Sequence, residues 1–286
     1  MAAVNKALDR ASAQAPQTNE RFIPTLPKEH ESFKFHGWKI SYTQSHILKS
    51  VCVDQCTEES GSPCELCVYE RTLGLPHLPD MVFHKNVLRL EHESGAVLEF
   101  NPMDALKLVE NGKMGPKVAC AGEWRESRSP QHTEEKCKPF DWTFKTDYAG
   151  TINEKFQVED VDMQLDFKKL ARREEILFYT DITLFEDELH DNGIAKYSVK
   201  IRVMPSGYYI LARYFLRLDK VMCMLNDARY HYEVENDYVL RECIARSEEC
   251  DKMKFDVRIR LHDNNLQNPE TLLPQVSRKT EKLKFQ

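Results

Sequence analysis

The segment 184–229 constrains the fold of this 286-residue chain more than any other part of it. Val199, Ile201 and Val203 alternate with polar residues, and this period of two indicates a strand with one buried face rather than an amphipathic helix. The next run, 209–216, is apolar on both faces, which is typical of a strand inside a covered antiparallel sheet. Turn-forming residues separate the runs, at Asn192–Gly193, Pro205–Gly207 and Asp219–Lys220. The segment is therefore predicted to be a β-meander.

The rest of the chain suggests how this meander is completed. Short strand-like runs at 33–40, 87–92 and 97–101 precede it, and helices interrupt them. Strands and helices that are separated in this way favour an α+β fold, and we expect a two-layer, sandwich-like antiparallel β-sheet scaffold with surrounding helices. We expect one domain over 32–250, a disordered extension at 1–31 and a polar flexible tail at 251–286.

Two helices can be located from their ends. Asn101 is placed as an N-cap, Pro102 as the first helical residue and Gly112 just past the end of one helix. A second helix is expected from Asp166 to about Glu175, with Phe167 facing inward.

Composition narrows the classes of function. Hydrophobic residues make up 41%, charged residues 30%, and the net charge of −6 gives no general attraction to nucleic acid. The chain has no run of about 18 apolar residues and begins without the apolar core of a signal peptide. We therefore expect a cytoplasmic or nucleocytoplasmic protein that binds neither nucleic acid nor membranes.

Signatures of catalysis are nearly absent. The chain lacks GxxxxGK, GxGxxG, HExxH and GxSxG motifs. The exception is an acidic cluster, whose carboxylates and imidazole are types that bind divalent metals: Glu186, Asp187, Glu188, His190 and Asp191. A solvated turn anchored by Leu189 is the alternative, and we favour it because contiguous acids repel one another into water.

Cysteine spacing allows a second kind of metal site. Nine cysteines in a chain without a secretion signal point to reduced thiols. Four of them fall within a Cys-rich insertion at 51–70: Cys52, Cys56, Cys64 and Cys67. Four thiolates at this spacing suit a tetrahedral structural zinc, and free surface thiols are the alternative. We otherwise expect no cofactor.

Aromatic and basic residues suggest a surface that binds a partner. Trp124 and Trp142 lie among charged neighbours, including Arg125 and Arg128, as interface anchors often do. Four cations come from adjacent predicted strands: Lys200, Arg202, Arg213 and Arg217. They form a basic strip if the register places them on one face, and the alternative is cross-strand pairing with nearby acids.

Several blocks of the chain resemble one known family. FEDELHDNG, SVKIRVMPS, YFLRLD and NDAR, at 185–229, are similar in order and spacing to the TIPRL family, the TOR signalling pathway regulator-like proteins that interact with type 2A protein phosphatases. FHGWKISYTQSHILKS at 35–50, VACAGEWRESR at 118–128 and KPFDWTFKTDYAGT at 138–151 extend the resemblance, which covers roughly 33–245.

The resemblance implies partner-binding roles for particular residues. Asp104 matches an Asp of the family, although an acid in the first turn of a helix also favours the helix dipole. Leu225, Asn226, Asp227 and Arg229 match a family segment that usually reads Met-Asn-Asp-Thr-Arg, from which Leu225 and Ala228 depart. Asn226 and Asp227 are equally suited to capping a turn.

Together these observations predict a monomeric, non-catalytic regulator rather than an enzyme. The resemblance implies binding of type 2A serine/threonine phosphatase catalytic subunits, including their C-terminal tail, in a cleft of the domain. It also implies inhibition or remodelling of their complexes in TOR signalling, with a further phosphatase-associated regulatory subunit of that pathway as a second partner. The alternatives are a metal-dependent phosphoester hydrolase that uses 186–191 and a zinc-stabilised scaffold protein.

Overall fold

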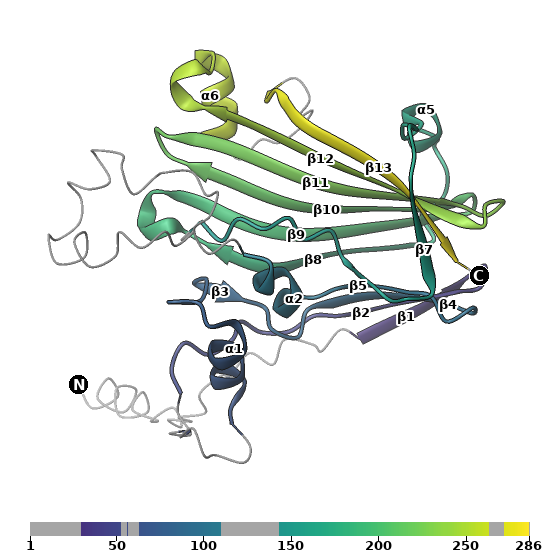
Figure 1. Ribbon diagram of the computed structural model, residues 1–286, viewed down its shortest axis with the longest axis horizontal. Helices are drawn as coiled ribbons and strands as arrows, with labels where there is room; N and C mark the ends of the chain where they lie inside the picture. The colour runs from purple at the N-terminus through teal and green to yellow at the C-terminus, as the bar shows by residue number, and fades with distance from the viewer. Residues whose placement is uncertain (1–29, 53–55, 57–62, 110–142, 263–271, 286) are drawn as a thin grey trace, which may run out of the picture.

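Two antiparallel sheets stacked face to face make up the computed structural model of this chain (Figure 1). The structure describes residues 30–52, 56, 63–109, 143–262 and 272–285. The larger sheet has eight strands in the order β3-β8-β9-β10-β11-β12-β13-β7, and the smaller has five in the order β1-β2-β4-β5-β6. The expected two-layer α+β fold built on antiparallel sheets is confirmed.

The predicted meander forms the centre of the eight-stranded sheet. Its strands follow one another in the sheet as they do in the sequence: β8 (Phe178–Asp187), β9 (Gly193–Met204), β10 (Gly207–Leu218), β11 (Met222–Glu233) and β12 (Tyr238–Glu249). Pro205 and Ser206 make the two-residue turn between β9 and β10, because Met204 pairs with Gly207. The predicted turn at Asp219–Lys220 joins β10 to β11, and Lys220 takes a positive φ of 62° there.

Strands from distant parts of the chain complete the eight-stranded sheet. They are β3 (Met81–Val82), β7 (Phe156–Asp160) and β13 (Gln275–Phe285). β13 lies between β12 and β7, and its Leu283 is fully buried. The expectation of a polar flexible tail at 251–286 is therefore wrong for this strand. Its sequence, QVSRKTEKLKF, is polar because much of one face remains exposed, whereas Leu283 and Phe285 join the core.

The five-stranded sheet contains β1 (His30–Phe35), β2 (Trp38–Thr43), β4 (Val87–His92), β5 (Val97–Phe100) and β6 (Thr151–Ile152). The run 33–40, expected as one strand, is a hairpin. Phe35 pairs with Trp38, and His36 and Gly37 both take positive φ angles of 42° and 78°. Two consecutive positive φ values are the geometry of a tight two-residue hairpin turn, which a hydrophobic alternation alone does not reveal.

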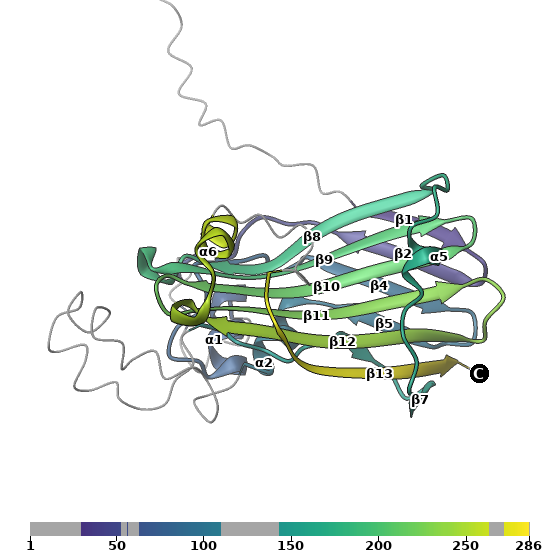
Figure 2. The same ribbon diagram turned by 90° about the horizontal axis from the view of Figure 1, so that it is seen from above.

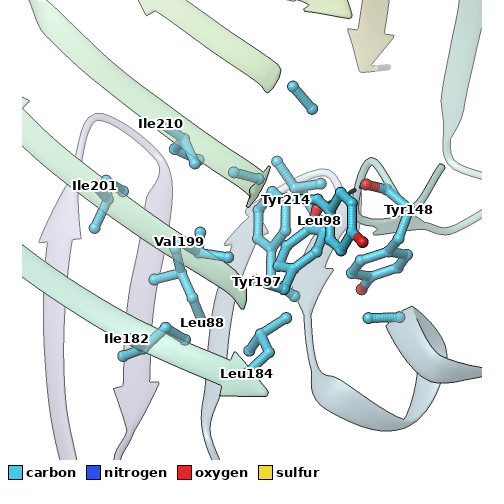
Figure 3. Packing of buried hydrophobic residues seen from close by; sticks show 14 of the residues in the cluster. Leu88, Leu98, Tyr148, Ile182, Leu184, Tyr197, Val199, Ile201, Ile210 and Tyr214 are labelled. Atoms are coloured by element: carbon cyan, nitrogen blue, oxygen red, sulfur yellow. Dashed lines mark hydrogen bonds between the residues drawn. The ribbon is translucent and has the colours of Figure 1, made fainter. Parts of the chain in front are cut away.

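The core lies between the two sheets. We call the face of the eight-stranded sheet toward the smaller sheet the inner face, and the opposite face the outer face. Side chains of the inner face, such as Val199, Ile201 and Ile210, belong to the same buried cluster as Leu88 and Leu98 of the smaller sheet (Figure 3). The outer face is visible in Figure 2, where β8 to β13 run side by side.

Helices lie at the ends and edges of the sheets. α5 (Phe167–Leu170) and α6 (Phe255–His262) lie over the outer face at opposite ends of its strands, whereas α1 (Glu65–Leu73) and α2 (Pro102–Lys107) lie on the side of the smaller sheet (Figure 1). Short 3-10 turns occur at η2 (Leu189–Asp191) and η3 (Cys250–Lys252). Among the described helices, none has the length and apolar character needed to cross a membrane.

Candidate functional site

The register of the meander places the four predicted cations on one face. Lys200 of β9 stands opposite Leu211 of β10, and Arg202 stands opposite Tyr209. Directly paired residues share a face, and residues two apart along a strand share it as well. Lys200 and Arg202 therefore lie on the same face as Arg213 and Arg217, and this is the outer face.

These four cations do not form a strip of unpartnered charges. The Lys200 Nζ lies 2.8 Å from Asp181, its cross-strand neighbour on β8, and the Arg213 Nε lies 2.7 Å from Asp227 on β11. The Arg217 Nε lies 2.8 Å from Asp219, and Arg202 donates a hydrogen bond of 3.0 Å to the Leu170 carbonyl. The alternative of cross-strand pairing with acids holds for Lys200 and Arg213, whereas Arg217 pairs with an acid two residues further along the chain.

Asp227 is the centre of a buried ionic cluster on the outer face. Its carboxylate accepts two hydrogen bonds from Arg213, of 2.7 and 2.8 Å, and one of 3.0 Å from Arg229. The Asp227 side chain is only 2% exposed, and that of Arg229 is 5% exposed. The Phe167 ring of α5 lies 5.8 Å from the Arg229 guanidinium, so Phe167 points over this cluster while remaining exposed to solvent. The expected burial of Phe167 is wrong.

Leu225 is buried on the outer face by a different part of the chain. It belongs to an apolar cluster with Phe215, Val257 and Leu272, which come from β10, α6 and the segment before β13. The predicted outer-face residues are therefore largely occupied by contacts within the chain.

Asn226 faces the other side of the sheet from Asp227. Adjacent residues of a strand point to opposite faces, so Asn226 lies on the inner face, directly opposite Tyr214. Asn226 is partly exposed, in contrast to its buried neighbours Leu225 and Asp227. Asn226 and Asp227 cannot contribute to one contact surface through the same face of β11.

Tyrosines of the inner face hold the segment 143–151. Tyr214 donates to the Thr143 carbonyl at 2.9 Å, Tyr197 donates to the Tyr148 carbonyl at 2.6 Å, and Tyr230 donates to the Ala149 carbonyl. Figure 3 shows Tyr148, Tyr197 and Tyr214 gathered at this end of the core. Burial raises the pKa of Tyr148 to about 12, so its hydroxyl keeps its proton at neutral pH. Three strands thus fix the backbone of one connecting segment.

Asp104 is attached to the same segment from the side of the smaller sheet. The Asn101 side chain caps α2 by accepting from the Asp104 N–H at 2.8 Å, and its amide donates to the Asp104 carboxylate at 2.9 Å. Thr151 donates to that carboxylate at 2.8 Å, and Lys107 donates at 3.2 Å. Partial burial opposes ionisation, but these donors outweigh it and lower the pKa of Asp104. The side chain is charged at neutral pH and 30% exposed.

Asp104 therefore contacts the segment 143–151 through Thr151, and Asn226 lies opposite Tyr214, which donates to Thr143 of that segment. We call these two residues with that segment the inner-face site. Val109 bridges to Thr146, and Thr146 donates to the Ala105 carbonyl of α2 at 2.9 Å, which ties the segment to α2. Trp124, Arg125, Arg128 and Trp142 lie in 110–142, outside the described residues. The described residues on either side of that range, Val109 and Thr143, both contact the inner-face site.

The tyrosines of this site are not identified by the sequence pattern alone. Tyr197, Tyr214 and Tyr230 occur at inward positions of apolar strands, where the alternation of polarity does not distinguish them from core residues. A buried tyrosine usually finds a partner for its hydroxyl, so three tyrosines on one inner face indicate a polar segment packed against them.

The side chain of His190 lies outside the described part of the structure, and the other candidate ligands of the acidic loop 186–191 form no group whose metal-binding atoms converge. The buried Asp187 accepts from the backbone N–H groups of Leu189 and Asp80, at 2.7 and 3.0 Å, and burial raises its pKa. Glu186 pairs with Lys196 at 2.7 Å. Leu189 is fully buried and anchors the loop as expected. Within the described ranges, the group whose metal-binding atoms converge is instead the set of four cysteines, Cys52, Cys56, Cys64 and Cys67.

Comparison with known proteins identifies the family of this chain. Residues 81–254, from β3 to the residue before α6, match the model of the TIP41-like family. The chain belongs to the TIP41-like family. The match confirms the resemblance to TIPRL proteins, which are the same family.

Relatives within the TIP41-like family include animal and fungal proteins. The human "TIP41-like protein" is 43% identical over 228 residues, which cover 78% of this chain and 79% of the relative. The fission yeast Schizosaccharomyces pombe has a relative that is 33% identical over 269 residues, covering 90% of this chain and 100% of the relative. The Saccharomyces cerevisiae relative is 34% identical over 238 residues, which cover 76% of this chain and 63% of the relative. Both yeast proteins are named "Type 2A phosphatase activator".

Proposed function

We propose that this chain is a non-catalytic regulator of type 2A serine/threonine phosphatases that acts by binding their catalytic subunits. The observation that carries this proposal is family membership over most of the two-sheet domain, together with relatives named as type 2A phosphatase activators. The regulator engages the catalytic subunit and its C-terminal tail, works as a monomer in the cytoplasm or nucleus, and serves TOR signalling with a further regulatory subunit.

The proposed mechanism is a shift between phosphatase assemblies. A protein that binds the catalytic subunit better in one assembly than in another changes their populations by that difference in affinity. Such a regulator inhibits one complex and favours another, so inhibition or remodelling of one assembly is compatible with the name "activator" carried by the yeast relatives.

The inner-face site is the part of the described surface that we assign to the phosphatase. Asp104 offers a charged carboxylate that is 30% exposed, and Asn226 offers a partly exposed amide. The outer face is a weaker candidate because its cations already have acidic or carbonyl partners and Asp227 is buried. An exposed polar group gains more from a new partner than one that must first lose an existing ion pair.

Binding measured on immobilised catalytic subunit tests the site. Asp104→Asn removes the charge but keeps an oxygen acceptor, and we expect binding about tenfold weaker, which corresponds to about 1.4 kcal/mol. Asp166→Asn is the matched control, because Asp166 is also an acid at a helix N-terminus but caps α5 over the outer face. We expect this control to bind like the unaltered chain.

A second pair of variants separates the two faces. We expect Asn226→Ala to weaken binding and Lys200→Ala, on the outer face, to leave it unchanged. If Lys200→Ala weakens binding and Asp104→Asn and Asn226→Ala do not, the phosphatase binds the outer face and the inner-face assignment is wrong. Absence of saturable binding by the unaltered chain overturns the proposed function itself.

The competing hydrolase hypothesis has a direct test. Asp187 and Glu186 already have structural partners, so the loop that would supply metal ligands is used within the fold. We expect the isolated chain to show no turnover of phosphoester substrates in the presence of divalent metals. Turnover that is lost in a Glu186→Gln variant would support the hydrolase instead.

A further inference from the structure

Four cysteine thiols converge at the connection between β2 and α1. The Sγ atoms of Cys52, Cys56, Cys64 and Cys67 all lie within 4.8 Å of one another. Those of Cys52 and Cys64 are 3.7 Å apart. The other described cysteines, Cys223, Cys243 and Cys250, lie on β11, β12 and η3, in a different part of the fold.

We propose that Cys52, Cys56, Cys64 and Cys67 bind one structural Zn²⁺ ion in a tetrahedral site. Zinc bound by four thiolates has Zn–S distances of about 2.3 Å, which places neighbouring sulfurs about 3.8 Å apart. The spacing between Cys52 and Cys64 agrees with this edge length. Four protein ligands leave no open position, so the ion has no catalytic role.

The backbone around the thiols favours bound thiolates. The Cys56 N–H donates to the Cys52 Sγ at 3.3 Å, and the Cys64 N–H donates to the Cys56 Sγ at 3.2 Å. Hydrogen bonds of this kind orient the ligands of a metal and balance their charge. Cys64 is also the N-cap of α1, where the helix dipole favours negative charge, and its side chain makes no capping hydrogen bond.

The arrangement suits a metal better than a disulfide or four independent thiols. A disulfide requires two sulfurs about 2.05 Å apart, whereas all four cysteines are unbridged and the Sγ atoms of Cys52 and Cys64 lie 3.7 Å apart. Four thiolates packed this closely repel one another unless a cation lies between them. The cysteines also differ in burial, with Cys67 buried and the other three partly exposed, as expected when ligands surround one point from different sides.

The proposed ion links the connection between β2 and α1 to the first turn of α1. Leu66 and Tyr69 of α1 pack into the main core, and the Tyr69 hydroxyl donates to the His84 carbonyl at 3.0 Å. Glu65, the first residue of α1, pairs with Lys85 at 2.6 Å and with His84. α1 also contacts α2, which carries Asp104. Zinc therefore stabilises the side of the molecule on which α2 lies, independently of whether a phosphatase binds there.

Metal content of the full-length chain tests this proposal. The chain is purified without a metal-affinity step under reducing conditions and measured by elemental analysis, and we expect one zinc per chain. After removal of zinc, titration with Co²⁺ should give the thiolate-to-cobalt charge-transfer and d–d bands of a tetrahedral site. Cys64→Ser should lose the zinc and the spectrum, whereas Cys243→Ser, a half-buried cysteine outside the cluster, should retain both.

The effect of a chelator on the Tm tests for bound zinc in the unaltered chain itself, so it does not depend on whether a variant folds correctly. A strong chelator should lower the Tm of the unaltered chain and of Cys243→Ser, and should leave the Tm of Cys64→Ser unchanged. The proposal is overturned if the reduced, unaltered chain contains no zinc and gives no cobalt spectrum. It is also overturned if Cys64→Ser retains full zinc, or if iron occupies the site in place of zinc.

Discussion

At the scale of single residues, the neighbours Asn226 and Asp227 show how one strand serves two purposes. Asp227 pairs with the guanidinium groups of the partly buried Arg213 and the buried Arg229, and the Phe167 ring lies over Arg229. Asn226 points to the inner face, opposite Tyr214. A buried charge is tolerated only with partners, so we interpret Asp227 as a stability residue and Asn226 as a residue available to a partner.

This interpretation predicts the effect of neutralising Asp227. Asp227→Asn removes the buried carboxylate that pairs with Arg213 and Arg229, and we expect the free energy of unfolding to fall by about 3 to 5 kcal/mol. The matched control is Asp181→Asn, whose partner Lys200 is 47% exposed, and it should cost at most about 1 kcal/mol. Urea denaturation of the two variants measures the difference. Equal losses would show that the Asp227 cluster contributes no more than a surface ion pair.

At the scale of elements, local sequence signals predict where a helix begins better than where it ends. Asn101 caps α2 and Pro102 is its first residue, as predicted. α2 ends at Lys107, however, before the expected stop at Gly112, and α5 spans only Phe167–Leu170 instead of reaching Glu175. An N-cap acts through a hydrogen bond within three residues, whereas the length of a helix depends on what its face packs against.

The tyrosine hydroxyls that hold 143–151 provide a prediction at this scale. Tyr197→Phe removes the donor to the buried Tyr148 carbonyl and should lower the free energy of unfolding by about 1 to 3 kcal/mol. Tyr208→Phe is the matched control, because the Tyr208 hydroxyl is buried on the same face without a hydrogen-bond partner among the described residues. We expect the control to be neutral or slightly stabilising. Denaturant unfolding that ranks the two variants in the reverse order would contradict this role for Tyr197.

At the scale of the whole molecule, the two sheets are joined by strands that are far apart in the sequence. β13 comes from the end of the chain and pairs with β12 on one side and β7 on the other. Its Phe285 ring lies 5.2 Å from the ring of Trp38, in β2 of the smaller sheet. The last strand therefore contributes to both layers of the sandwich.

This role of β13 can be tested with two substitutions on the same strand. Leu283→Ala opens a cavity in the core and should lower the free energy of unfolding by about 2 to 5 kcal/mol. Val276→Ala, at a side chain that is 66% exposed, should change it by no more than about 0.5 kcal/mol. If both variants unfold at the same denaturant concentration as the unaltered chain, β13 is not an integral part of the domain.

The sequence by itself determined the meander, its turns, the N-terminus of α2 and the family. Each of these depends on residues close in the chain, such as the alternation around Val199 or the turn at Pro205–Ser206. The sequence also marks the four cysteines as a candidate metal site, because they lie close together in one short stretch of the chain. The family resemblance also marks Asp104 and Asn226 as partner-binding candidates, without placing them in the fold.

Only the tertiary structure decided which of those residues share a surface. Strand register places Asn226 and Asp227 on opposite faces of the sheet. Ion pairs with acids occupy outer-face cations such as Arg213. Pairing with β12 makes the polar C-terminal segment a strand. The physical reason is the same in each case: a side chain's availability depends on neighbours that are distant in sequence, and alternation of polarity does not identify those neighbours.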